Sequence, residues 1–119
     1  MAKLVVLISR DREKGVDIAE AWQKRCGATG VTIIDSYGLG SLEEQRQSKE
    51  LPMFISMASV LHQVRATNQM LFSAVEDHLV DSMIEVAQEM MGSLDNPDTG
   101  ILFVVPIDRV VGLAHKGRK

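Results

Sequence analysis

Cysteine, aromatic residues and long hydrophobic runs are all scarce in this sequence of 119 residues. The single cysteine, Cys26, has no partner for an internal disulfide, which is typical of a protein from a reducing compartment. The longest apolar runs, "LVVLI" and "ILFVVPI", are too short to cross a bilayer, so we expect no membrane insertion. Charged residues follow "LVVLIS" at once, which favours a first strand over a signal peptide. We therefore expect a cytoplasmic protein.

Positive charge is missing from a long part of the chain. Residues 66–108 contain no Lys or Arg but eight acidic side chains, and cations return only at Arg109 and in the final stretch "HKGRK". Binding to nucleic acid needs a clustered basic face, which a short tail does not provide. We expect no nucleic acid partner.

The hydrophobic pattern divides one domain, residues 1–119, into two similar units. The expected strands cover 3–9, 31–37, 70–75 and 101–106, and the expected helices cover 11–27 and 76–92. A short edge piece at "VVGLA" is also expected. This βαββαβ order predicts an α+β, ferredoxin-like fold, in which a four-stranded antiparallel sheet carries both helices on one face.

Helix ends are indicated by residue type. Asp11 and Asp77 are expected as N-caps, because a short side-chain oxygen there accepts from free backbone N–H groups. Gly27 and Gly92 are expected just past the helix ends, where a positive φ suits glycine.

One face of such a sheet has no covering layer. Leu4, Val6, Ile33 and Phe103 supply more apolar surface than two helices can cover, so we expect self-association. The continuous apolar runs do not reveal whether Ile33 or Phe103 faces outward.

The glycine corner at Gly38, Leu39 and Gly40 ends the second expected strand. A dinucleotide fingerprint would need a third glycine where Glu43 stands. The pattern is therefore typical of a tight corner, at which glycine permits positive φ.

A metal site is the main chemical candidate from residue spacing. Asp77, His78 and Asp81 fall within one helical turn, a spacing that metal ligands can use. Acids in a first helical turn are also favoured by the helix dipole alone. No nucleophile with its base can be assembled from the sequence, and we expect no enzyme.

The connection of residues 41–69 begins with a polar stretch and continues as "LPMFISMASVLHQV". Met53, Phe54 and Met57 in this stretch either cover the core or form a surface for a partner. Both interpretations remain open at this point.

Three segments resemble the PII signal-transduction family: "GVTIIDSYGLG", "FSAVEDHLVDSMIEVAQ" and "DTGILFVVPIDRVVGL". They occur in the order and with the spacing of that family. Its members are ferredoxin-like homotrimers that regulate rather than catalyse, bind adenine nucleotides in clefts between subunits, and contact target proteins through a loop that begins at a Gly-x-Gly corner.

The resemblance implies a homotrimer whose segment 41–69 binds a target such as a transporter or a metabolic enzyme. It also implies ligand contacts at two places in the sequence. These residues are Gly38, Leu39, Gly40, Thr99 and Gly100.

The chain departs from the family pattern where phosphate and magnesium are bound. Segment 41–69 has no tyrosine, the usual modification site, and Leu42 stands where the family has a glutamine for magnesium and 2-oxoglutarate. Ile101, Gly112 and Ala114 stand where the family has cations for phosphate. ATP and ADP, the ligands that the resemblance implies, are therefore expected to bind weakly, and the ATP/2-oxoglutarate readout is expected to be lost.

Two alternatives belong to other classes. A divalent-metal-binding trimer like the CutA proteins would use the cluster at Asp77, His78 and Asp81. A small ferredoxin-like enzyme would need a base, for which His62 is the one candidate in the connection.

Overall fold

The computed structural model describes residues 1–37, 68–95 and 99–113. Several residues singled out from the sequence lie outside these ranges. They are Gly38, Leu39, Gly40, Leu42, Met53, Phe54, Met57, His62 and Ala114.

The described elements follow the expected βαββαβ order. They are β1 (Ala2–Ser9), α1 (Arg12–Lys24), β2 (Thr32–Ser36), β3 (Asn68–Glu76), the short 3₁₀ helix η1 (Asp77–Leu79), α4 (Val80–Met91) and β4 (Gly100–Pro106). The ferredoxin-like prediction is confirmed. Within the described ranges, no helix is long and apolar enough to span a membrane.

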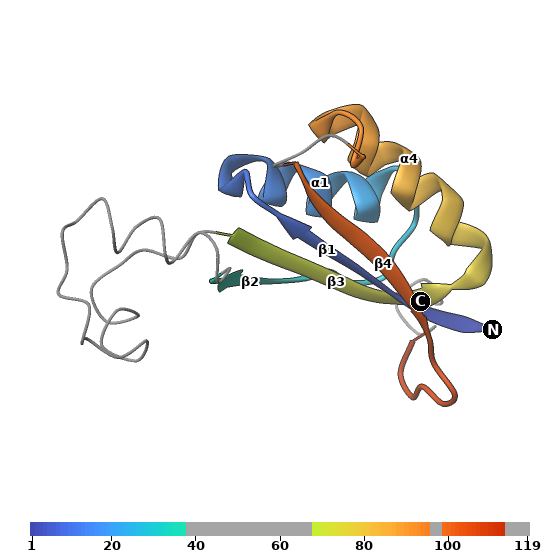
Figure 1. Cartoon of the computed structure of the whole chain (residues 1–119). Helices are drawn as coiled ribbons and strands as arrows, with labels where there is room; N and C mark the ends of the chain where they lie inside the picture. The colour runs from blue at the N-terminus through green and yellow to red at the C-terminus, as the bar shows by residue number, and fades with distance from the viewer. Residues whose placement is uncertain (38–67, 96–98, 114–119) are drawn as a thin grey trace, which may run out of the picture.

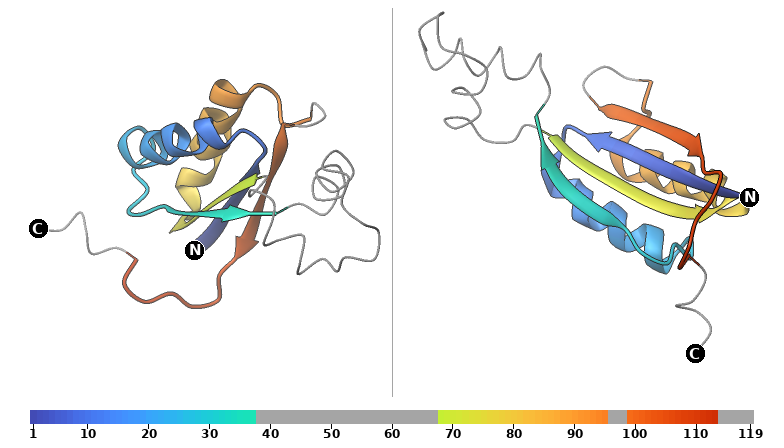
Figure 2. Two further views of the ribbon diagram at one scale, coloured as in Figure 1. Left: turned by 90° about the vertical axis from the view of Figure 1, so that its left-hand side faces the viewer. Right: turned by 90° about the horizontal axis from the view of Figure 1, so that it is seen from below.

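The sheet has the strand order β2-β3-β1-β4, and each neighbouring pair is antiparallel. Both helices lie on the same face of this sheet (Figure 1). The two further views show the opposite face without a helix (Figure 2). β1 and β2 are joined through α1 but do not touch as strands, because β3 lies between them.

The helix ends agree with the sequence at three of four positions. Asp11 caps α1 through its Oδ1, which accepts from the N–H groups of Glu13 (3.0 Å) and Lys14 (3.3 Å). Gly27 (φ 86°) follows the end of α1, and Gly92 (φ 86°) ends α4.

The prediction of Asp77 as an N-cap is wrong. Asp77 is the first residue of η1, and neither η1 nor α4 has a side-chain cap. The backbone N–H of Asp77 donates to the carbonyl of Met1 (2.9 Å), and its carboxylate lies 3.9 Å from the Lys3 Nζ. Asp77 therefore joins the start of η1 to the N-terminal residues through these two contacts and does not cap α4.

The core lies between the helices and one face of the sheet. Its side chains come from alternate positions of the strands and from the inner stripes of the helices, as the two periodicities require. The largest fully buried ones are Trp22, Leu7, Ile18, Leu71, Met83, Val5 and Val75. Cys26 is also buried and free, as expected of a core cysteine. Each large apolar side chain contributes about 1.5–3 kcal/mol when fully buried.

Two contacts join the helices directly. The indole N–H of Trp22 donates to the carbonyl of Met83 in α4 (3.0 Å). On the solvent side, the Arg25 guanidinium donates to both carboxylate oxygens of Glu89 (3.2 and 3.1 Å). This pairing raises the pKa of Arg25 and lowers the pKa of Glu89, mainly through the hydrogen bond and then through the opposite charge.

The strand register shows which side chains lie on the face of the sheet away from the helices. Val6 pairs with Phe72 on one side and Phe103 on the other, and Ile8 pairs with Met70 and Ile101. These residues lie on the face away from the helices, which we call the open face. It comprises Leu4, Val6, Ile8, Thr32, Ile34, Met70, Phe72, Ala74, Ile101, Phe103 and Val105.

The register also settles the alternative between Ile33 and Phe103. Ile33 pairs with the buried Leu71 and packs against the core. Phe103 lies on the open face with 41% of its surface exposed, between Ile101 and Val105, which are exposed as well.

Residues 107–113 follow β4 and form an irregular segment, which we call the strap. The expected edge strand at "VVGLA" is absent from the described part of this stretch, where Gly112 adopts φ 92°. The strap leaves the end of β4 and crosses the ends of β1 and β3 on the side away from the helices (Figure 2). Val111 within it is 93% exposed.

Candidate functional site

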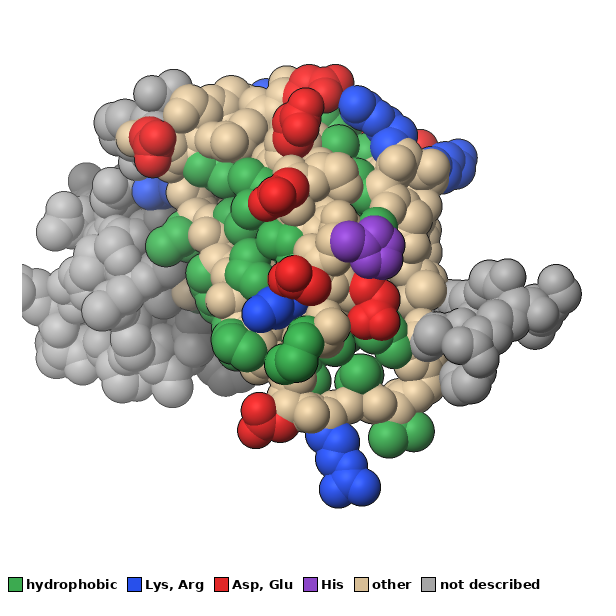
Figure 3. All heavy atoms as spheres, turned by 90° about the vertical axis from the view of Figure 1, so that its right-hand side faces the viewer, with side chains coloured by type: hydrophobic (Ala, Val, Ile, Leu, Met, Phe, Trp, Pro, Cys, Tyr) green, Lys and Arg blue, Asp and Glu red, His purple; other side chains and the backbone are tan. Residues whose placement is uncertain are grey.

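The strap and the body of the protein enclose two adjoining hollows. The larger, about 360 Å³, lies between the strap and the start of β2, and we call it the strap cleft. Its lining residues are Thr29, Gly30, Val31, Thr32, Ala74, Val110, Val111, Gly112 and Leu113. Figure 3 shows this end of the molecule, with an opening between the strap and the body.

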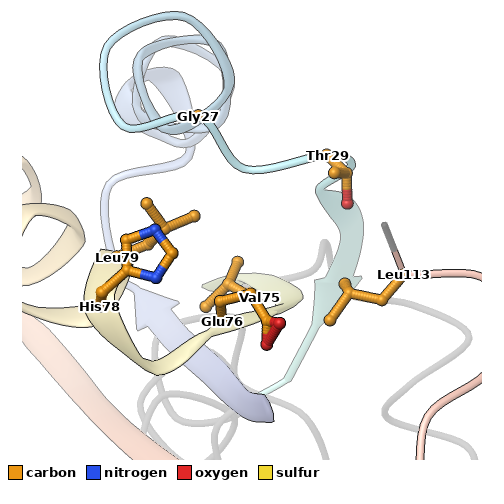
Figure 4. Close-up of a pocket in the computed structure, with 7 residues that line it drawn as sticks. All are labelled: Gly27, Thr29, Val75, Glu76, His78, Leu79 and Leu113. Carbon is orange, nitrogen blue, oxygen red and sulfur yellow. The ribbon is translucent and has the colours of Figure 1, made fainter. Parts of the chain in front are cut away.

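The smaller hollow, about 260 Å³, lies behind Thr29 and Leu113, which line both spaces, and we call it the inner hollow. Its lining residues are Gly27, Thr29, Val75, Glu76, His78, Leu79 and Leu113. Figure 4 places Val75 and Glu76 between His78 and Leu79 on one side and Leu113 on the other, with Thr29 above. Most of the exposed lining is apolar, and Glu76 and His78 supply its ionisable groups.

The walls of both hollows are fixed by contacts of the backbone. The hydroxyl of Ser73, which is buried in β3, donates to the carbonyl of Gly30 (2.5 Å) and so holds the loop before β2 against the sheet. The N–H of Ala28 donates to the carbonyl of Trp22 (3.0 Å) and closes the turn after α1. The N–H of Ile107 donates to the carbonyl of Ala2 (3.1 Å), which anchors the start of the strap.

Among the described residues, negative charge dominates the surroundings of the inner hollow. Glu76, Asp77 and Asp81 follow one another from the end of β3 into α4, and all three are exposed. The ammonium of Lys3 lies beside Asp77. Acidic side chains are spread over this face, with hydrophobic side chains between them (Figure 3).

The three residues proposed from the sequence as a metal cluster do not assemble into one. Asp77 is turned towards Lys3, and His78 lines the inner hollow. Within the described ranges, no three His, Cys, Asp or Glu side chains are placed to hold a metal ion together. The cause is the 3₁₀ helix at 77–79, which has three residues per turn and replaces the continuous α-helical turn that the spacing assumed.

The other predicted ligand contacts, Thr99 and Gly100, lie at the opposite end of the sheet. Thr99 accepts at its carbonyl from the N–H of Arg10 (3.4 Å) and borders a small hollow of about 150 Å³ with Asp11, Lys14 and Met91. Gly38, Leu39 and Gly40 follow β2 and lie outside the described residues.

Gly100 has a structural reason to be glycine. Its φ of 145° is unfavourable for a side chain, and a Cβ there would lie 2.4 Å from the carbonyl oxygen of Ile8. The crowding comes from β1, which pairs with β4 at this point.

A second close approach occurs where β3 begins. A Cβ on Gly15, in the first turns of α1, would lie 1.7 Å from the Oε1 of Gln69. Gln69 is buried, and this oxygen has no hydrogen-bond partner among the described residues. The missing side chain of Gly15 therefore makes room for a buried amide at the point where the chain re-enters the sheet.

Ile101 and Gly112, at whose positions the resemblance implies phosphate-binding cations, lie on two different surfaces. Ile101 is on the open face and 56% exposed, while Gly112 lines the strap cleft. The described residues that line the strap cleft include no Lys or Arg. They offer backbone groups, hydroxyls and apolar surface, but no side chain that would neutralise a phosphate.

Sequence reasoning missed the residues that form the hollows. Thr29, Glu76 and Leu113 come from three separate stretches. Glu76 and Leu113 fall within segments quoted for the family resemblance, but sequence reasoning assigned none of the three a role in a site. The only local signal is the run of small residues "GATG" after the first helix, which indicates a loop close to its neighbours.

Comparisons with known proteins agree with this architecture. The family model described as nitrogen regulatory protein P-II matches residues 1–116. Among solved structures, Arabidopsis thaliana PII bound to citrate is similar, with a TM-score of 0.59 and 20% identity over 89% of this chain and 77% of that chain. The divalent cation tolerance protein Cut A1 from Thermus thermophilus is similar with a TM-score of 0.60 and 14% identity, over 93% of this chain and 88% of that chain. No curated protein matches the sequence.

Proposed function

Because the chain belongs to the nitrogen regulatory protein P-II family, we propose that it is a non-enzymatic regulator that works as a homotrimer. In this proposal it binds a small ligand in clefts between subunits and a target protein through segment 41–69. The observation that carries the proposal is the open face of the sheet.

The apolar side chains of the open face are expected to be buried against another protein surface. It presents apolar side chains in rows across all four strands, and Ile34, Ile101, Phe103 and Val105 are each at least 40% exposed. An apolar surface of this kind on a small protein is typical of an interface. Copies of the same chain are the usual cover for such a face, and three copies would match the family.

Clefts between copies would also explain the placement of the ligand residues. Gly38 follows β2 and Gly100 begins β4, and these strands are the two outer edges of the sheet. Neighbouring strands are about 4.8 Å apart, so the two edges lie about 14 Å from each other in one subunit. In this proposal, the edge of another copy brings the end of β2 and the start of β4 near one another.

The ligand of these clefts is proposed to differ from the family's usual one. Ile101 and Gly112 replace cations, and eight acids without a Lys or Arg occupy residues 66–108. An ATP dissociation constant above about 0.1 mM follows, equivalent to about −5.5 kcal/mol. Calorimetry that gave a low-micromolar constant for ATP would contradict this part of the proposal.

Target binding is assigned to segment 41–69, with Met53, Phe54 and Met57 as the contacts. This assignment rests on the family and on the sequence, because these residues lie outside the described ranges. A partner such as a transporter or a metabolic enzyme would meet an apolar stretch that a rigid body presents.

The metal-binding alternative has less support. The similarity to the divalent cation tolerance protein concerns the fold, and the P-II family model matches nearly the whole chain. Asp77, His78 and Asp81 do not gather in the described structure.

A matched pair of variants tests the assembly. Phe103→Asp places a charge on the open face and is expected to dissociate the trimer while the subunit stays folded. Ile33→Asp places the same charge against the core and is expected to unfold the subunit, because an unpaired buried charge is costly. Light scattering measures the mass and circular dichroism the fold; a wild-type monomer at micromolar concentration would refute the proposal.

A further inference from the structure

The inner hollow combines an apolar wall with a negative rim inside one subunit. Val75, Leu79 and Leu113 supply the wall, and Glu76 supplies a carboxylate at the edge. Binding sites for small molecules commonly have this composition, with mostly apolar walls and one or two placed polar groups.

The size of the hollow limits what it can hold. Its volume is about 260 Å³. A molecule with a single ring or a short branched chain fits this space.

Charge decides the class of ligand. Glu76 is exposed, no ion pair of it is found among the described residues, and the chain continues directly into Asp77. Lys3 is next to this site in the sheet register, but its ammonium lies beside Asp77. Asp108 and Arg109 in the strap have opposite charges and do not line the hollow. Among the described residues, the charge at the rim therefore favours a cation and repels an anion.

We propose that the inner hollow binds a small organic amine, with its apolar body against Val75, Leu79 and Leu113 and its ammonium at the Glu76 carboxylate. The hydroxyl of Thr29 and the imidazole of His78 flank the same space and can accept further N–H groups. The described residues that line this site all come from one chain, and Thr29 and Leu113 line the strap cleft as well. The site does not depend on the proposed regulatory function.

Three probes of nearly equal shape test the charge preference. Benzylamine, benzyl alcohol and benzoate carry positive, zero and negative charge at pH 7 and are titrated into the full-length protein. Chemical shifts of the backbone amides report the site. We expect shifts centred on Thr29, His78 and Leu113, with benzylamine bound about two- to fivefold more tightly than benzyl alcohol, the factor typical of one exposed ion pair.

Two variants make the assignment specific. Glu76→Gln is expected to abolish the preference for benzylamine over benzyl alcohol. Glu85→Gln removes an exposed acid of α4 that does not line the hollow, and it is expected to leave the preference unchanged. Because Glu76 is exposed, neither substitution should unfold the protein.

Three results would overturn the proposal. They are equal binding of benzoate, a preference that survives Glu76→Gln, and the absence of binding by benzylamine at tens of millimolar, a limit close to about −2 kcal/mol. The oligomeric state measured in the same samples separates a failure of this site from a failure of the trimer.

Discussion

Gly100 offers the sharpest test of whether a residue shared with a ligand-binding motif serves the fold. Gly100→Ala would bring a Cβ to 2.4 Å from the Ile8 carbonyl oxygen and 3.3 Å from the Ser9 Cα, both parts of the neighbouring strand. Backbone cannot rotate away as a flexible side chain can, so β4 must shift. Gly27→Ala is the matched control, because Gly27 also has a positive φ (86°) but nothing within 4 Å of the added carbon.

The magnitudes follow from these two environments. Holding a non-glycine residue at positive φ costs about 1–2 kcal/mol, which is the expected loss for Gly27→Ala. Gly100→Ala adds an overlap with packed backbone, and overpacking of this kind costs a further 1–3 kcal/mol or so. A total loss of about 2–5 kcal/mol is large against the roughly 5–15 kcal/mol of a typical domain.

The assay is urea unfolding followed by the fluorescence of Trp22. This is the only tryptophan in the chain, and it is fully buried between the helices. Protein concentration is held constant, because the stability of an oligomer depends on it. If Gly100→Ala loses no more stability than Gly27→Ala, the steric argument is wrong and the glycine at 100 is needed for something other than folding.

Other variants probe contacts at both ends of the sheet. Ser73→Ala removes the bond to the loop carbonyl before β2 and is expected to lower the free energy of unfolding by about 1–2 kcal/mol in the same assay. Gly15→Ala, normally stabilising by about 1 kcal/mol in a helix, should gain nothing here because it displaces the amide of Gln69; the gain should return when Gln69→Ala is added, as a double-mutant cycle would show. The pKa of Glu89 is lowered in the folded state by Arg25, so its contribution to stability is present above the ordinary glutamate pKa of about 4.3 and fades as the pH falls through the folded value. Glu89→Gln should remove that part of the acid dependence, and an unchanged slope of stability against pH would contradict it.

The fold could be predicted from the sequence because the hydrophobic periodicity and the residues at helix ends indicate the same elements. Alternation between apolar runs and helical stripes gave the element order, and Asp11 and Gly92 marked helix ends that the structure confirms. The register of β4 was not predictable, since "ILFVVP" is apolar at successive positions and favours neither face. That is why the orientation of Phe103 needed the pairing with Val6.

The candidate site was harder to predict than the fold for a physical reason. Thr29, Glu76 and Leu113 meet only because the strap returns across the sheet, and no local pattern encodes that path. The wrong N-cap prediction at Asp77 has a different cause. Its residue type fits an N-cap, but a tertiary contact with the first residues of β1 decided its conformation.

The strand order has a consequence for how the chain folds as it is made. β1 and β2 are both complete within the first 37 residues, yet neither has a strand partner there, because β3 separates them. A nascent chain must therefore hold two unpaired strands until residues 68–76 leave the ribosome, and β3 then pairs with both. Halving the intervening connection would lower the cost of loop closure by only about 0.6 kcal/mol. The delay is set by the order in which the strands are synthesised, and chaperones that shield exposed β-branched segments would act during this interval.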